Sequence, residues 1–465
     1  GAAVQALRAP ILRISREVWD AAEVSLAEER SAEIHIRELR AAGFEIEGPG
    51  VAGVPTHFVA TWSQGAGGPA IGFLPEYDAL PGLGNAAEPR RTARADGVES
   101  GHGCGHNVLG AGCTGAGMAL KAIMEASGAP GTVKVFGCAS EESHSGKAYL
   151  ARAGYFEGLD AALAWHSGPA AGTGLVSTSA NRGMKLEFFG QTAHAGNTPW
   201  EGRSALDAAE IATHAINMMR EHVRPTARLH YIFDSAGRAP NIVPDYARLW
   251  LVLREADTPA VEALVAWASE IAEGAALATQ TRAEARVFSG VAELIPNRPL
   301  AERLLAHMTA RGLTWTEDEQ DFARACQREM GLPETGMATE ILPLVPETSI
   351  GGSTDVADVS WNAPTAVFLW PSLPQGVSLH TWAVTACGGM SIGDRASLDS
   401  AAILAATGWD LMTDAALRDA AREDWRARIG GRAYVNAIPP EQAEPIAIPA
   451  HLRKTGGDEL DAATG

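Results

Sequence analysis

The sequence contains few cysteines and comparatively few basic residues. Only 5 of its 465 residues are Cys, an odd number spread widely along the chain. A secreted disulfide framework has an even number at close spacing, so we expect a reducing compartment and predict a cytoplasmic protein. Lys and Arg number 37 against 56 Asp and Glu, which gives a formal net charge of −19. Because no basic stripe is available to neutralise phosphates, nucleic acid is excluded as an expected partner.

Long hydrophobic runs are also missing. No apolar stretch reaches the roughly 18 residues that a membrane-spanning helix needs, so we expect no membrane partner. With 46% apolar and 20% charged residues, the composition is that of a globular protein, and the length suits two domains. The chain becomes rich in Pro between residues 439 and 449. We therefore expect residues 431–465 to form an extended, weakly ordered tail.

The pattern of apolar residues predicts an α/β fold. Residues 11–42 have helical spacing. Short buried runs then predict strands of a doubly wound, mostly parallel sheet at 70–74, 132–137, 161–165 and 366–370. We expect this sheet to form a catalytic domain built from two parts of the chain, residues 1–180 and 291–430.

The pattern changes between these two parts. Residues 181–290 show the order βαββαβ, with Leu249, Leu251 and Leu253 alternating along one predicted strand. This order is that of a ferredoxin-like α+β unit, which can fold as a compact insert. The sequence therefore predicts an inserted lid or dimerisation domain at residues 181–290.

A glycine-rich loop carries the first residues with metal-binding chemistry. Cys104 and His106 lie in this loop, and Glu142, His166 and His380 follow downstream. Divalent cations in catalytic centres use this mixture of Cys, His and carboxylate ligands. Because sulfur keeps lone pairs after its first bond, Cys104 could hold two metals at once. The alternative is a buried free cysteine beside surface histidines.

The adjacent residues Glu141 and Glu142 suggest a division of labour. One carboxylate can ligate metal while its neighbour takes a proton from a metal-activated water. A Glu-Glu pair is also common as solvated surface charge, and a lone His after a strand is often structural. The joint occurrence of these segments beyond predicted strands favours a metal site, because open α/β sheets place their ligands there.

Several motifs extend this pattern over residues 10–435. They are Glu76–Pro81, Gly103–Asn107, Glu141–Glu142 with Ser145–Lys147, Trp165–His166, Gln191–Gly196, Asn241–Asp245 and Gly352–Val356. Together they resemble metallopeptidase family 20, the dinuclear metal amidohydrolases of the aminoacylase/carboxypeptidase type. The branch with aminobenzoyl-glutamate and auxin-conjugate hydrolases is the most similar.

The resemblance implies a cofactor and a set of roles. Two divalent ions, which could be zinc, manganese, cobalt or nickel, would be held by Cys104, His106, Glu142, His166 and His380. Glu141 would be the general base, and Asp78 would orient His106. His194 would reach the active site of the partner subunit in a homodimer formed through the inserted domain and stabilise the oxyanion. Its simpler alternative is a histidine that caps a turn.

Other polar residues are candidates for contacting a small-molecule substrate. Asn241 and Arg238 lie on the loop between the two central strands of the predicted insert, and Arg182 and Arg203 are weaker candidates. Two positions depart from the family pattern. Glu76 stands where many relatives have a ligand His, and His144 stands where small residues are typical. We expect the His144 imidazole to enter the substrate pocket.

These observations predict a metal-dependent hydrolase that cleaves the amide bond of a small N-acyl or N-aroyl amino acid. One alternative is hydrolytic deamination of an aromatic amine at the same dinuclear site. Another is a cysteine hydrolase with Cys104 as nucleophile, which would leave the Glu pair without a role. A non-catalytic binding protein is a third alternative, and the presence of both Glu141 and the full ligand set counts against it.

Overall fold

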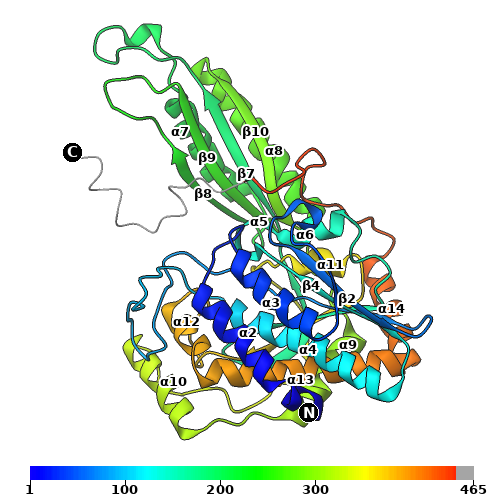
Figure 1. Ribbon diagram of the computed structural model, residues 1–465. Helices are drawn as coiled ribbons and strands as arrows, with labels where there is room; N and C mark the ends of the chain where they lie inside the picture. Colours follow the sequence, from blue (N-terminus) through cyan, green and yellow to red (C-terminus); the bar gives the residue numbers. More distant parts are fainter. Residues whose placement is uncertain (447–465) are drawn as a thin grey trace.

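A computed structural model of the protein describes residues 1–446. They form a large α/β body from which a second, smaller sheet with two helices projects (Figure 1). The strands are β1 (Glu45–Glu47), β2 (Phe58–Gln64), β3 (Ala70–Phe73), β4 (Gly131–Gly137), β5 (Ala161–Gly168), β6 (Gly172–Thr178), β7 (Ala180–Phe189), β8 (Arg228–Ser235), β9 (Tyr246–Glu255), β10 (Arg282–Val291), β11 (Val345–Ile350) and β12 (Thr365–Pro371). None of the described helices is both long and apolar enough to cross a membrane.

The large sheet has eight strands in the order β1-β2-β4-β3-β5-β12-β6-β11. Its centre, β4-β3-β5-β12, is parallel, whereas β1, β2 and the β12–β6 pair are antiparallel. The predicted α/β fold with a mostly parallel sheet is therefore confirmed. All four strands expected from the buried runs lie at this parallel centre. Because helices cover both faces of the sheet there, successive residues of these strands are mostly apolar.

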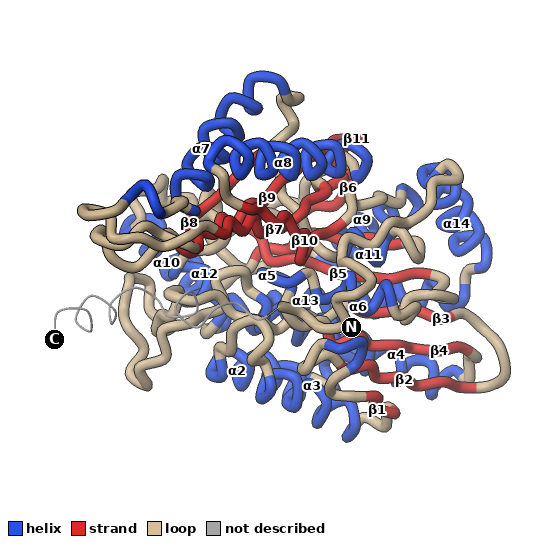
Figure 2. Tube along the Cα trace, turned by 90° about the horizontal axis from the view of Figure 1, so that it is seen from above, coloured by secondary structure: helices blue, strands red, loops and turns tan. Residues whose placement is uncertain are grey.

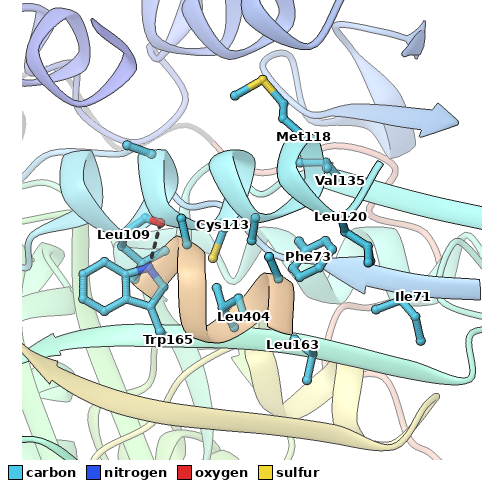
Figure 3. Packing of buried hydrophobic residues seen from close by; sticks show 14 of the residues in the cluster. Ile71, Phe73, Leu109, Cys113, Met118, Leu120, Val135, Leu163, Trp165 and Leu404 are labelled. Atoms are coloured by element: carbon cyan, nitrogen blue, oxygen red, sulfur yellow. Dashed lines mark hydrogen bonds between the residues drawn. The ribbon is translucent and has the colours of Figure 1, made fainter. Parts of the chain in front are cut away.

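Helices cover both faces of the large sheet (Figure 2). The α-helices of the described residues are α1 (Ala2–Ala6), α2 (Arg8–Ala21), α3 (Glu29–Ala41), α4 (His106–Ser127), α5 (Glu141–His144), α6 (Gly146–Arg152), α7 (Ala205–Met219), α8 (Thr258–Thr279), α9 (Arg298–Arg311), α10 (Glu317–Glu329), α11 (Val356–Ser360), α12 (Trp382–Gly388), α13 (Ser391–Thr413) and α14 (Ala415–Ile429). Two of them, α7 and α8, belong to the smaller sheet. On one face, α4 and α13 enclose Trp165, whose indole N–H donates to the Leu109 carbonyl at 3.0 Å (Figure 3). This packing holds the start of α4 against β5.

The smaller sheet contains β7, β8, β9 and β10 in the order β10-β7-β9-β8, with every pair antiparallel. Including α7 and α8, the element order is βαββαβ, as expected. Leu249, Leu251 and Leu253 are fully buried against the helices, together with Leu186 and Phe188. The alternate residues of each strand therefore face the other way, toward the large body or solvent.

The C-terminal segment differs from its expectation. Residues 432–446 contain no helix or strand, but they are anchored to both parts of the molecule. Asn436 donates to the Ala148 carbonyl at 2.7 Å, Gln442 donates to the Phe288 carbonyl on β10 at 2.8 Å, and Ile438 is 2% exposed. The prediction of a weakly ordered tail is wrong for this part, because its apolar and amide side chains find buried partners. Residues 447–465 lie outside the described residues.

Candidate active site

Five side chains from four segments of the chain meet at the edge of the large sheet. Three ligand atoms, from Cys104, His106 and His166, lie within 4.8 Å of one another, and so do those of Cys104, Glu142 and His380. Cys104 belongs to both groups. The geometry therefore offers two adjacent cation positions that share one sulfur.

Individual distances support this arrangement. The Cys104 Sγ lies 3.5 Å from the His166 Nε2, and the His380 Nε2 lies 3.4 Å from the Glu142 Oε2. Among the described residues, three buried atoms at this point have no hydrogen-bond partner: His106 Nε2, Glu142 Oε1 and Glu76 Oε2. Buried polar atoms are normally paired, and a bound cation would supply a partner for the His106 Nε2 and the Glu142 Oε1. The donor set, with its thiol, imidazoles and carboxylates, fits divalent metal ions.

Tight backbone geometry delivers these ligands. Gly105 has a φ of +77°, and a Cβ there would lie 2.2 Å from the Ser167 Oγ, so only glycine fits between Cys104 and His106. After β4, Ser140 has a φ of 57° and starts the short helix α5. The Glu28 carboxylate accepts from the Ser140 N–H at 2.8 Å and holds this turn. Glu141 and Glu142 are thereby presented at the end of the strand.

Asp78 lies behind His106. Its carboxylate accepts from the His106 Nδ1 at 2.9 Å, the Ser25 hydroxyl at 2.8 Å and the Glu142 N–H at 3.0 Å. Burial alone would raise the pKa of Asp78, but these hydrogen bonds, led by that from His106, bring it down to about 2. With its Nδ1 proton held by Asp78, His106 presents the lone pair of Nε2 to the centre.

Negative charge is concentrated at this point. Burial raises the pKa of the Cys104 thiol well above its ordinary value, and Glu142 raises it further. Burial also raises the pKa of Glu141 well above its ordinary value, and the negative charges of Glu76 and Asp355 raise it further. A divalent cation stabilises the anionic form of each group, so metal binding would reverse both shifts.

Lys147 supplies an internal positive charge. Its fully buried Nζ lies 2.6 Å from the Glu76 Oε1 and 2.5 Å from the Asp355 Oδ1. This pairing leaves the Glu76 Oε2 facing the His106 Nε2 at 3.3 Å. The sequence singled out Lys147 and Asp355 only as members of motifs, and Glu76 in addition as a departure from the family pattern. Their contacts join segments some 70 and 208 positions apart, so no local pattern could reveal them.

A cavity of about 740 Å³ opens over these residues between the two sheets. One wall carries Cys104, Glu141, Glu142, His166 and His380, and the opposite wall carries Arg228, His230, Trp250, Val252 and Arg254 from β8 and β9. The Arg254 Nη1 donates to the Ser353 Oγ at 2.8 Å. Sequence reasoning missed this second wall. The sequence did contain a signal for it. Leu249, Leu251 and Leu253 alternate along β9 and face the helices, so Trp250 and Arg254 must face the opposite side of the sheet.

Three predicted residues lie away from this cavity. The loops that follow β7 and β8 lie at the end of the smaller sheet that points away from the large body (Figure 1). They carry His194, Asn241 and Arg238, which are exposed, and the Ala195 N–H donates to the Asn241 carbonyl at 3.0 Å. Asn181 at the start of β7 lines the cavity, and β7 ends at Phe189, a span of about 26 Å at strand spacing. These residues therefore do not reach the cavity of their own chain.

His144 and two arginines are also placed elsewhere. The His144 Nε2 lies 2.9 Å from the Ile446 carbonyl, and the residue is not among those that line the cavity. The expectation that its imidazole enters the pocket is thus not met, because the C-terminal segment takes the side chain. The buried Arg182 forms an ion pair with Glu262 and donates to backbone carbonyls. Arg203 donates to the Gln280 side-chain carbonyl at the surface.

Comparisons with known proteins identify the family of the chain. One of the p-aminobenzoyl-glutamate hydrolase subunits of Escherichia coli (strain K12) is 34% identical, over 94% of this chain and 96% of that protein. A Xaa-Arg dipeptidase from Mus musculus is 28% identical, over 91% and 90%. The fold matches the crystal structure of an aminobenzoyl-glutamate utilization protein from Klebsiella pneumoniae with a TM-score of 0.58 at 18% identity, over 85% of this chain and 96% of that one. The model of peptidase family M20/M25/M40 matches residues 73–381, and the chain therefore belongs to this family of amidohydrolases.

Proposed function

We propose that the protein is a metal-dependent hydrolase that cleaves the amide bond of a small N-aroyl or N-acyl amino acid. The observation that carries this proposal is the shared position of Cys104 in two ligand groups, with Glu141 beside them and Arg254 on the facing wall of the same cavity. The name of the 34% identical relative, which belongs to a p-aminobenzoyl-glutamate hydrolase, supports an aroyl amino acid as substrate.

Each group has a task in this reaction. Cys104, His106, Glu142, His166 and His380 would hold two divalent ions, which would supply a water of lowered pKa and a Lewis acid for the scissile carbonyl. Glu141 takes a proton from the attacking water and returns it to the leaving nitrogen. Arg254 lies within the electrostatic influence of Glu141 and offers a charged donor to the substrate carboxylate. Deamination of a simple aromatic amine would leave Arg254 without such a partner.

Metal removal tests the proposal directly. We expect chelation to lower hydrolysis of N-(4-aminobenzoyl)-L-glutamate by about 100-fold or more, because both water activation and carbonyl polarisation are lost. Added zinc, manganese, cobalt or nickel should restore the activity, and the best ion identifies the cofactor. The readout is release of 4-aminobenzoate by chromatography, with bound metal measured by mass spectrometry. Full activity in protein shown to be free of metal would contradict the proposal.

The distant position of His194 supports a homodimer in which each inserted domain completes the partner's site. His194 accepts the backbone N–H groups of Gly196 and Asn197 at Nδ1, at 3.2 and 3.1 Å, which leaves Nε2–H as a free donor for an oxyanion. Ile232 on the edge strand β8 is 49% exposed, and Met218 on helix α7 is 72% exposed. Apolar side chains beside an open strand edge suit pairing with a second copy.

Subunit mixing tests this arrangement. His194→Ala and Glu141→Gln homodimers should each be nearly inactive. Mixed at equal amounts with free exchange, they should regain about a quarter of wild-type activity, because half the dimers are heterodimers and each has one intact composite site. Exchange is followed by native mass spectrometry of protomers with different tags. Heterodimers that form without any recovered activity would show that His194 does not act across the interface.

A further inference from the structure

Three basic side chains on the cavity wall of the smaller sheet lack acidic partners. Arg228 and His230 lie on β8, and Arg254 lies directly opposite Arg228 on β9. Like charges at directly opposed positions of an antiparallel pair destabilise a sheet. Within residues 1–446, no carboxylate lies in ion-pair distance of any of the three. This cluster stands in a chain whose formal net charge is −19.

Two other cations on the same face of the sheet have a carboxylate partner. Farther from the large body, Lys185 and Arg248 share the buried carboxylate of Asp234, each at 2.6 Å. At the cavity, by contrast, burial and then the charges of Arg254, Arg220 and Arg228 lower the pKa of His230. At the cavity, Arg228 and Arg254 therefore face each other across two strands, and among the described residues no carboxylate lies at ion-pair distance from either.

Hydrogen bonds and ring contacts orient the side chains of the wall that carries this charge. The Arg228 Nη1 donates to the carbonyls of Pro225 and Ala227, both at 2.7 Å. Beside it, the Trp250 ring is held by the Lys185 Nζ at 4.2 Å and by Phe288 at a ring distance of 5.9 Å. The Trp250 Nε1 is buried without a hydrogen-bond partner among the described residues. Fixed donors lose little conformational freedom when an anion binds.

We propose that Arg228 and His230 form a subsite for a second carboxylate of the substrate, so that the enzyme selects N-acyl derivatives of dicarboxylic amino acids. The inference rests on the proposed function, in which Arg254 binds the first carboxylate. A glutamate or aspartate moiety would place one carboxylate at Arg254 on β9 and the other at Arg228 and His230 on the neighbouring strand. The like-charged pair would then gain the counter-charge that the fold itself does not provide.

A pair of isosteric substrates tests the subsite. N-(4-aminobenzoyl)-L-glutamate and N-(4-aminobenzoyl)-L-glutamine differ in the charge of one side chain and hardly in size. We expect the metal-loaded wild-type enzyme to prefer the glutamate derivative by about 10- to 100-fold in kcat/KM, the range expected for hydrogen bonds to a charged group. Arg228→Gln should reduce this preference to less than about threefold, mainly through KM for the glutamate derivative. His230→Asn should have a smaller effect of the same kind.

Arg224→Gln is the matched control, since it removes the same charge from the same domain outside the cavity lining. It should leave the preference unchanged. An equal preference for both substrates in the wild type, an unchanged preference in Arg228→Gln, or an equal loss for both substrates in that variant would overturn the subsite.

If the wild type cleaves neither substrate, the proposed function fails, but the subsite can still be tested by binding. Calorimetry with glutarate and with 4-carbamoylbutanoate, its monoamide, separates the two questions. Tighter binding of glutarate that is lost in Arg228→Gln would support the subsite, and equal binding of the two compounds would refute it.

Discussion

Replacement of Glu141 by Gln is expected to lower kcat by about 100-fold or more, which is the scale of a general-base contribution. The amide cannot take a proton from the attacking water, and the side chain keeps nearly the same shape. Glu141 lines the cavity and belongs to neither ligand group that shares Cys104, although it forms a third possible group with Glu76 and His106. We expect it to act as the base and not as a ligand. Bound metal and thermal stability should therefore stay close to those of the wild type.

The neighbouring residue provides a matched control. Glu142→Gln makes the same chemical change one position away, at a side chain 3.4 Å from His380 and 3.9 Å from His106. It should lose metal as well as activity. The measurements are steady-state kinetics at saturating metal and metal content per protomer. Near-normal turnover in Glu141→Gln would rule out this residue as the base, and metal loss in both variants would make Glu141 a ligand.

The second large effect is expected at Cys104. Serine is a poor metal ligand at neutral pH but similar in size, so Cys104→Ser should lose at least one metal per protomer and nearly all activity. Cys104→Asp should restore part of both, because a carboxylate can bridge two ions. Metal content by mass spectrometry, measured alongside turnover, checks the expectation.

The same variants separate a bridging thiolate from a nucleophile. A nucleophilic cysteine would leave Cys104→Ser fully metallated but inactive, and the wild type would form an acyl-thioester during turnover. Cys113→Ala serves as control, since Cys113 is another buried thiol on α4 that belongs to none of the ligand groups. Unchanged metal in Cys104→Ser would overturn the bridging assignment and favour the cysteine-hydrolase alternative.

Strands were predicted best from the sequence where burial on both faces of the sheet produces an uninterrupted run of apolar residues. The central strands β3, β4, β5 and β12 were predicted because strands covered on both faces are apolar along their whole length. The outer strands of the large sheet were missed. In β11, for example, most residues are exposed, so its pairing with β6 leaves no hydrophobic pattern. The helical lead-in is broken after α2, because Ala22 adopts a left-handed conformation with a φ of 42° that spacing alone does not reveal.

The chemistry of the site was accessible from the sequence to a similar degree. The sequence showed that a thiol, imidazoles and paired carboxylates follow successive predicted strands. Because the carboxyl ends of parallel strands lie at one edge of the sheet, these groups could be expected to lie close together. The direction of each side chain was not determined. His102 of the same loop is turned away and contacts the Val18 carbonyl at 3.0 Å, whereas Cys104 faces the centre.

By itself, then, the sequence determined which residues could bind metal and which elements carry them, since these depend on residue chemistry and local periodicity. Only the tertiary structure decided the charge balance through Lys147 and the cationic wall of Arg228, His230 and Arg254. It also decided that His194 lies at the opposite end of the inserted sheet from the cavity. The physical reason is that electrostatic pairing and reach depend on distances in space between residues far apart in the chain, and these distances are set only when the two sheets pack.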